Sequence, residues 1–149
     1  MEDKEIKVLI FNINGEYFAA DIMEIERIIG YEDPTKIPDS PDFVEGVINY
    51  SGNILPVISL SKRFNLGDSE NRSQAKIIVT KQDQNKIGII VDIVSEVKDI
   101  SSSTIEPAPD IVSGISKRYI NGLIKIDGKI IIFLNISKIL TEEEKQLIQ

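Results

Sequence analysis

The chain has 149 residues, which is enough for one ordinary domain or for two very small ones that share a core. It contains no Cys, His or Trp, so disulfides, thiolate nucleophiles, imidazole bases and the usual zinc ligands are excluded together. The net charge is −7, from 17 basic and 24 acidic side chains, and this charge repels phosphate backbones and anionic lipid. The composition therefore argues against most catalytic sites and against nucleic acid as a partner.

The N-terminus and the apolar runs indicate a cytoplasmic protein. Residues 1–5 are charged and largely acidic, where a signal peptide would be basic and then apolar. No apolar run approaches the roughly 20 residues that a membrane-spanning helix needs. We expect no direct membrane insertion and no cofactor.

Most of the chain is expected to form short strands. Ile, Val, Phe and Tyr cluster in brief runs that are separated by polar turn residues. Each predicted turn contains Asn, Asp or Gly, the residues that most readily adopt the positive φ of a tight hairpin. The hairpin turns are expected at residues 14–15, 51–53, 82–85 and 127–129.

Helical signals are few, and the helices that they predict are short. Residues 59–66 are expected to make two turns, with Ser59 as the N-cap. Asn135 is expected to cap a short helix over residues 136–140. A capping-box pattern then opens a C-terminal helix over residues 141–148.

The second half of the sequence repeats the first. Residues 46–62 align with residues 122–138, and both copies run glycine, strand, glycine turn, strand, polar N-cap and short helix. A half of about 70 residues would be marginally stable alone, so the two halves are expected to pack together. We expect a mainly β fold of two small barrel-like sheets around a joint hydrophobic core, related by a rough two-fold axis.

The expected domain organisation is a single domain over residues 1–149 made of two subdomains. These cover roughly residues 6–66 and 75–140, and a polar linker near residues 67–74 joins them. Strand exchange between the subdomains stays open. A groove between them is a natural binding site.

Candidates for catalysis are sparse. Asp21, Glu24 and Glu26 form an acidic cluster that in principle holds Mg²⁺ or Ca²⁺ through oxygen ligands, but solvated surface charges explain the cluster more simply. The chain has no phosphate-binding glycine motif and no nucleophile elbow. We expect a protein that is not an enzyme and has no metal site.

Two apolar segments, residues 22–29 and 91–97, follow the second strand of each half. Their aliphatic residues lie two to four positions apart. They pack one half against the other if they belong to the core, and they receive a partner's helix if they face the groove. The pattern does not separate these two roles.

Several motifs occur in a characteristic order along nearly the whole chain. They include Pro41-Asp42-Phe43-Val44-Glu45-Gly46-Val47-Ile48-Asn49, the strands over residues 54–58 and 88–92, Ile105-Glu106-Pro107-Ala108-Pro109 and the hairpin and helix of residues 122–140. In this order and spacing the chain resembles the CheW family. The resemblance implies two five-stranded SH3-like β-barrels that share a core, with short helices and a C-terminal helix.

The resemblance also implies a function. CheW-like proteins are scaffolds that couple chemoreceptors to the CheA histidine kinase, and they catalyse no reaction. The implied partners are the regulatory domain of a CheA-type kinase and the cytoplasmic tip of a methyl-accepting chemoreceptor. The implied location is cytoplasmic, at membrane receptor arrays that are reached through these partners.

By position, the resemblance implies a receptor-binding groove between the subdomains. Gly46 matches a family glycine where added bulk would disturb a turn or the docking surface. The kinase-contacting residues are not predicted. The groove candidates are Ile22, Ile25, Arg27, Ile28, Gly46, Ser51, Val94 and Val97.

Two of these positions depart from the family pattern. The family commonly has Glu where this chain has Arg27, and Arg where it has Ser51, so the usual ion pair cannot form. Arg27 is left to bond Glu24, Glu26 or a carboxylate of a partner. The departure keeps open an alternative function, an adaptor for another receptor–kinase pathway such as surface motility.

Overall fold

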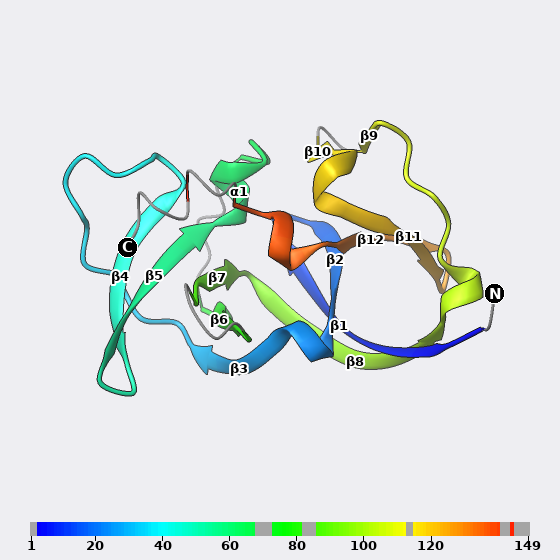
Figure 1. Ribbon diagram of the computed structural model, residues 1–149, viewed down its shortest axis with the longest axis horizontal. Helices are drawn as coiled ribbons and strands as arrows, with labels where there is room; N and C mark the ends of the chain where they lie inside the picture. The colour runs from blue at the N-terminus through cyan, green and yellow to red at the C-terminus, as the bar shows by residue number, and fades with distance from the viewer. Residues whose placement is uncertain (1–2, 68–72, 82–85, 113–114, 141–143, 145–149) are drawn as a thin grey trace.

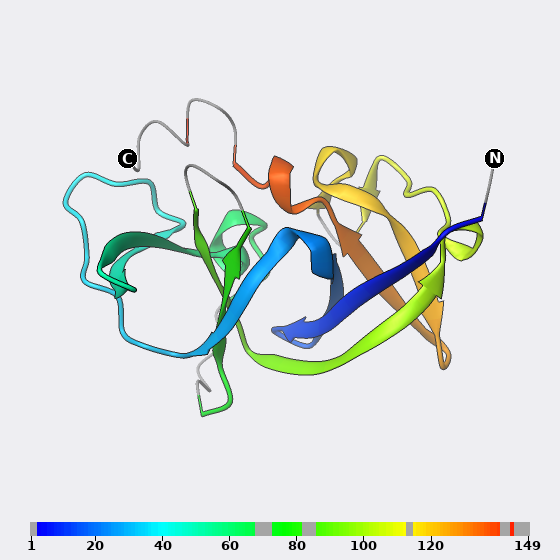
Figure 2. The same ribbon diagram turned by 60° about the horizontal axis from the view of Figure 1, so that its bottom comes forward.

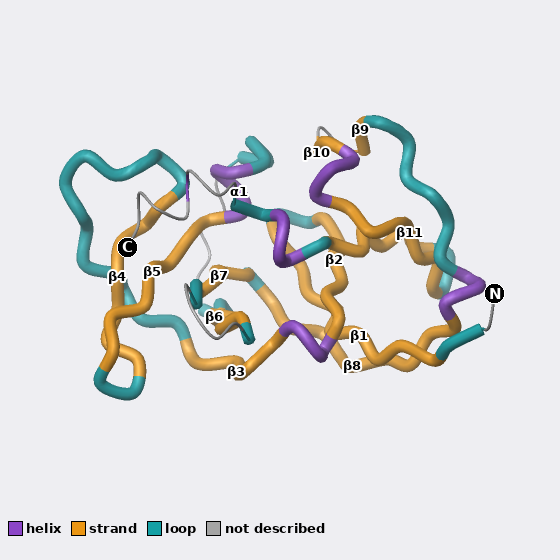
Figure 3. Tube along the Cα trace, in the orientation of Figure 1, coloured by secondary structure: helices purple, strands orange, loops and turns teal. Residues whose placement is uncertain are grey.

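The computed structural model describes residues 3–67, 73–81, 86–112, 115–140 and 144 (Figure 1). Strands make up most of it, and the helical segments are single turns between them (Figure 3). The strands are β1 (Glu5–Ile13), β2 (Glu16–Asp21), β3 (Ile25–Gly30), β4 (Val44–Tyr50), β5 (Asn53–Ser59), β6 (Lys76–Thr80), β7 (Gly88–Val91), β8 (Ile93–Ser101), β9 (Ile111–Val112), β10 (Ile115–Ser116), β11 (Ile120–Ile126) and β12 (Lys129–Leu134). The helical segments are η1 (Ile22–Glu24), α1 (Leu60–Arg63), η2 (Ser102–Thr104), η3 (Lys117–Tyr119) and η4 (Ile136–Lys138).

The tight hairpin turns lie where the sequence predicts them. They connect β1 to β2, β4 to β5 and β11 to β12, and each carries two consecutive residues with positive φ. These residue pairs are Asn14 and Gly15, Ser51 and Gly52, and Asp127 and Gly128. The predicted loop at residues 82–85, most of the predicted linker and most of the predicted C-terminal helix lie outside the described residues.

The predicted short helices are partly correct. Ser59 caps α1, because its Oγ accepts the N–H of Lys62 at 3.2 Å. The helix is shorter than predicted, since Asn65 adopts a φ of 57° and cannot continue it. The expectation that Asn135 caps the next helix is wrong. Its side chain accepts no backbone N–H from the first turn of η4, and its Oδ1 instead accepts the hydroxyl of Ser137 at 2.8 Å.

Two five-stranded sheets dominate the fold, as the sequence and the resemblance predict. One has the order β11-β12-β2-β1-β8 and the other β3-β6-β7-β5-β4, and Figure 1 shows them side by side along the long axis. Parallel pairing of β5 with β7, and of β12 with β2, places hairpins from different halves of the sequence in one sheet. Each sheet is therefore built from both halves of the sequence. When the strand order of one sheet is reversed, equivalent strands of the repeat occupy the same positions in the two sheets.

Each sheet curls until the segment that follows one edge strand meets the other edge strand. Thr35, which follows β3, exchanges backbone hydrogen bonds of 2.8 and 2.9 Å with Val47 on β4. Glu106, which follows β8, exchanges bonds of 2.9 and 2.8 Å with Leu123 on β11. The two sheets close in the same way, on strand residues Val47 and Leu123 that the sequence repeat makes equivalent.

The core forms three clusters, one within each curled sheet and one between the sheets. On β1, Val8 and Ile10 face the cluster inside their own sheet, whereas Leu9 and Phe11 face the joint cluster. Burial on both faces explains why this strand is apolar throughout rather than alternating. The joint cluster includes Leu9, Phe11, Phe18, Ile58, Phe64, Ile78, Ile89 and Leu134, which confirms the predicted shared core.

Candidate partner-binding site

The five aliphatic groove candidates lie on three connected elements around the joint core. Ile22 begins η1, Ile25 and Ile28 lie on β3, and Val94 and Val97 lie on β8. Ile22, Ile25 and Val94 are half-buried against the joint core. Ile28 is 36% exposed and Val97 is 50% exposed. The first three therefore contribute to the core, and the last two are open to solvent.

Strand register explains why Ile28 and Val97 lie at the margin of the joint core and are exposed there. Val97 pairs with Leu9 and Ile28 pairs with Ile78, and both of these partners belong to the joint core. Directly opposed residues of antiparallel strands point to the same face of a sheet. Because β3 and β8 are edge strands, each side chain has a strand neighbour on one side only. Figure 2 shows β3 and β8 on the same side of the molecule.

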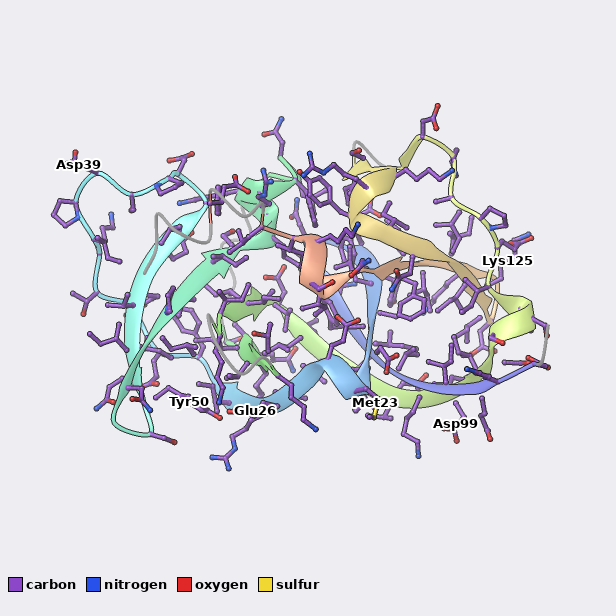
Figure 4. The ribbon with its side chains drawn as sticks, viewed as in Figure 1. Met23, Glu26, Asp39, Tyr50, Asp99 and Lys125 are labelled. Atoms are coloured by element: carbon purple, nitrogen blue, oxygen red, sulfur yellow. The ribbon has the colours of Figure 1, made fainter. Side chains whose placement is uncertain are left out.

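Two further apolar side chains on these elements are exposed. Met23 on η1 is 71% exposed and Ile93 at the start of β8 is also exposed. Figure 4 shows Met23 at the same edge, between Glu26 and Asp99. Sequence reasoning missed Met23 as a site candidate, although it lies inside one of the two apolar segments that it singled out. Ile93 pairs with Asn12 and therefore points to the opposite face of β8 from Val97. We call Met23, Ile28 and Val97 the apolar strip.

A carboxylate beside the strip ties the two edges of one sheet together. Glu26 Oε2 on β3 accepts the hydroxyl of Tyr50 on β4 at 2.6 Å, and its Oε1 lies 2.6 Å from Lys86 Nζ. These two partners hold the pKa of Glu26 below its ordinary value, Lys86 having the larger effect. The hydrogen bond to Glu26 raises the pKa of Tyr50. The contacts support the curl of the sheet next to the strip.

The two departures from the family pattern are not joined to each other. Arg27 follows the register shift of β3 and is exposed, and Ser51 is exposed in the turn between β4 and β5. Within the described part of the chain, Arg27 makes no hydrogen bond or ion pair, including none to Glu24 or Glu26. Glu26 and Tyr50, which directly precede Arg27 and Ser51 in the chain, link β3 to β4 instead.

Gly46 is buried on β4 and faces the chain that crosses this strand. A Cβ at this position would lie 2.2 Å from the backbone oxygen of Thr35, and the φ of 144° also disfavours a side chain. Gly122, its counterpart in the repeat, has a φ of 158°, and its Cβ would lie 2.8 Å from the backbone oxygen of Glu106. Glycine is thus needed at position 46 because the backbone at Thr35 crosses β4 there, too close for a side chain.

The acidic cluster of the η1 region does not converge on one point. Asp21 Oδ1 accepts the N–H of Met23 at 2.9 Å, and Glu26 is held by Tyr50 and Lys86. The Glu24 carboxylate is directed toward the backbone N–H groups of Ile136 and Ser137 at the start of η4, which lower its pKa, and its buried Oε2 has no hydrogen-bond partner among the described residues. Among the residues that the structure describes, no three acidic side chains come together as metal ligands. The arrangement therefore offers no support for the metal-dependent alternative.

Glu24 is expected to make stability depend on pH. Burial, and then the charge of Asp21, raise its pKa above the ordinary 4.5. A carboxyl with a raised pKa favours the folded state at low pH and loses this contribution as the pH rises through the folded-state pKa. Glu24→Gln should therefore gain stability relative to the natural chain as the pH rises above 4.5, measured by urea unfolding at several pH values.

Glu26→Gln is the matched control for this experiment, because the pKa of Glu26 is shifted in the opposite direction. Its ionised form favours the folded state, so this variant should lose stability relative to the natural chain as the pH rises toward 4.5, and the loss should stay constant above that value. Equal responses of the two variants would contradict these opposite roles of the two carboxylates.

A second pair of exposed apolar residues lies at the hairpin tips. Ile54 at the start of β5 is 77% exposed, and Ile130 at the start of β12 is 57% exposed. The sequence repeat makes these positions equivalent. Sequence reasoning identified the turns that precede them but not the exposure of the isoleucines. We call Ile54 and Ile130 the tip isoleucines.

The fold and its exposed surfaces define a class of protein, a β-sheet module that binds other macromolecules. Curled sheets with apolar edges and apolar tips offer docking surfaces. A family model described as CheW-like domain matches residues 7–144, and the chain belongs to this family. No helix in the described part of the chain has the length and apolar character needed to cross a membrane.

Individual relatives agree over most of their length. The chain is 34% identical over 140 residues to the chemotaxis protein CheW of Klebsiella aerogenes, covering 94% of this chain and 84% of that protein. It is 36% identical over 142 residues to the chemotaxis protein CheW of Thermotoga maritima, covering 93% and 90%. The crystal structure of the scaffolding protein TtCheW from Thermoanaerobacter tengcongensis is 33% identical, with a TM-score of 0.87 and coverage of 95% and 91%.

Proposed function

We propose that this chain is a chemotaxis scaffold that couples chemoreceptors to a CheA-type histidine kinase. Membership in the CheW-like family and the names of its relatives support the chemotaxis role, and they favour it over an adaptor for another pathway. The relative of known structure, TtCheW, is a scaffolding protein, which supports a scaffolding role for this chain. The structural observation that carries the proposal is the apolar strip at the margin of the joint core.

The apolar strip is the proposed receptor-binding surface. Its side chains come from η1, β3 and β8, so a receptor helix that covers them contacts both sheets at once. Covering exposed apolar side chains contributes about 25 cal/mol per Å² before the cost of ordering is subtracted. Ile22, Ile25 and Val94 lie on the same elements as the strip and are packed against the joint core, so they connect the strip to the core.

The tip isoleucines are the proposed kinase-binding surfaces. They lie on the hairpins β4–β5 and β11–β12, whereas the strip lies on η1, β3 and β8. Separate surfaces allow one molecule to hold both partners, and each bound partner raises the effective concentration of the other. The adaptor itself carries out no reaction. It acts in the cytoplasm and reaches the membrane through its receptor.

The test is a binding measurement with two partners, a purified receptor-tip fragment and a purified kinase regulatory domain from the same genome. Ile28→Asp and Val97→Asp should each weaken receptor binding about thirtyfold or more, because each inserts a charge into a surface that must be dehydrated. Both should leave kinase binding unchanged. Ile54→Asp is the matched control and should weaken kinase binding alone.

Circular dichroism and urea unfolding of each variant show whether it is folded. A loss of both partners in a folded variant would contradict the separation of surfaces. Receptor binding that is insensitive to Ile28→Asp and to Val97→Asp would remove the apolar strip as its site.

A further inference from the structure

We propose that Lys76 selects a receptor helix that carries an Asp or Glu next to its apolar face. This inference rests on the proposed function, because it names the charge that the receptor must present beside the apolar strip. Lys76 is an exposed residue at the start of β6, the strand that pairs with β3. Since β3 carries Ile28 of the apolar strip, Lys76 lies on the strand next to the proposed receptor-binding surface.

Strand register places Lys76 on the face of the sheet that carries Ile28. Gly30 pairs with Lys76, and Ile28 pairs with Ile78 in the same antiparallel ladder. Residues two apart on a strand point to the same face, so Lys76 shares the face of Ile78, which belongs to the joint core. Ile28 is on that face too, because it lies directly opposite Ile78. Lys76 and Ile28 are therefore diagonal neighbours, within reach of a long side chain.

The other sheet has the same arrangement beside Val97. Val97 pairs with Leu9, and two residues along the ladder Asp99 pairs with Lys7. Leu9 belongs to the joint core, so Lys7 and Asp99 lie on the face of Val97. The Asp99 carboxylate lies 3.6 Å from the Lys7 ammonium. Lys7, the counterpart of Lys76, therefore has a counter-charge within its own sheet.

Gly30 stands where Asp99 stands in the other sheet, and it provides no such counter-charge for Lys76. Within the described part of the chain, the Lys76 ammonium makes no hydrogen bond or ion pair. The backbone does not require glycine at position 30, because its φ is not positive and no atom lies within 4 Å of the position of a Cβ. The space opposite Lys76 is therefore open to a carboxylate of a partner.

The charge of the whole chain makes Lys76 selective. The net charge is −7, so an acidic partner is repelled by most of this protein but attracted at Lys76. A helix that covers Ile28 removes water from around the ammonium, and a carboxylate on that helix replaces the lost hydration. A basic residue at the same place would face a like charge. Because Lys7 is already paired, this selection acts on the β3 side of the apolar strip alone.

The experiment uses the full chain and the receptor-tip fragment of the preceding section. Lys76→Glu should weaken binding about tenfold. Each acidic residue of the fragment is replaced in turn by Lys, and one such fragment should bind the natural chain weakly and bind Lys76→Glu with its affinity largely restored. The control is Lys117→Glu, the same charge change at an exposed residue of η3. This segment follows β10, which Figure 1 shows at the opposite edge of the molecule from β3 and β8.

Gly30→Asp tests the same charge from the neighbouring strand. The new carboxylate would stand opposite Lys76, as Asp99 stands opposite Lys7, and should occupy the ammonium. Receptor binding should weaken about threefold or more at low ionic strength, and this effect should shrink as salt is added. Gly30→Asn is the matched control, because it has a similar size and no charge, and it should bind as the natural chain does.

The outcomes separate this inference from the proposed function. If Ile28→Asp weakens binding but no fragment restores Lys76→Glu, the inference is overturned and the receptor function stands. Equal weakening by Lys76→Glu and Lys117→Glu overturns it as well, because only net charge would then matter, and so does equal weakening by Gly30→Asp and Gly30→Asn. If the natural chain does not bind the fragment at all, the proposed function fails and this inference fails with it.

Discussion

Replacing Gly46 by Ala is expected to lower the free energy of unfolding by about 3 kcal/mol or more. The added Cβ would lie 2.2 Å from the backbone oxygen of Thr35, so the crossing chain must move away. This movement breaks the two hydrogen bonds between Thr35 and Val47 that close the sheet. Since a domain of this size has a total stability of only about 5–15 kcal/mol, the loss is large.

Gly52→Ala is the matched control for Gly46→Ala. Gly52 also has a positive φ, of 82°, but no atom lies within 4 Å of the position of its Cβ. Only the backbone conformation then opposes the substitution, at about 1–2 kcal/mol. Urea unfolding measures both variants. Equal losses would show that positive φ, rather than the backbone crossing, explains the glycine at position 46.

Replacing Arg63 by Met is expected to destabilise the protein by about 3 kcal/mol. Its Nε donates to the Ile139 backbone oxygen at 3.1 Å, and its Nη2 donates to the Tyr119 hydroxyl at 2.9 Å and to Glu144 at 3.0 Å. The guanidinium also lies 5.0 Å from the centre of the Phe43 ring. Methionine retains much of the apolar stem but leaves these acceptors without their donor.

The control for Arg63→Met is Lys7→Met, which removes an ion pair of 3.6 Å between side chains that are more than half exposed. Such pairs contribute about 0–1 kcal/mol, so the stability measured by urea unfolding should change little. A similar effect of the two substitutions would mean that Arg63 does not hold α1 to η3 and to the chain after η4.

The exchange of hairpins connects the proposed partner surfaces through one core. β3 follows a hairpin of the opposite sheet through η1, and β8 follows a hairpin of the opposite sheet directly after Asp92. The apolar strip therefore spans both sheets, and each sheet also carries one tip isoleucine. A receptor helix on the strip would contact the same two sheets that a kinase bound at the tips would contact, which is the physical requirement for coupling the two proposed sites.

Local chemistry made several features predictable. Residues that tolerate positive φ marked the three tight hairpin turns, and Ser59 marked the start of α1. The repeat predicted equivalent glycines, and the structure gives both the same backbone crossing. Asn135 was misleading, because an asparagine before a helix indicates a cap without ensuring that its side chain accepts a backbone N–H of the first turn.

The sequence alone thus determined the mainly β class, the positions of the tight turns, the two-fold repeat and the family, because turn chemistry and strand propensity act over a few residues. Tertiary structure alone decided which hairpins share a sheet and which aliphatic residues are exposed. Ile25 and Ile28 are chemically identical on one strand, yet the first packs against the joint core and the second is open to solvent. Both lie on edge strand β3, so their exposure depends on what each residue packs against, and that is set by pairings between residues far apart in the chain.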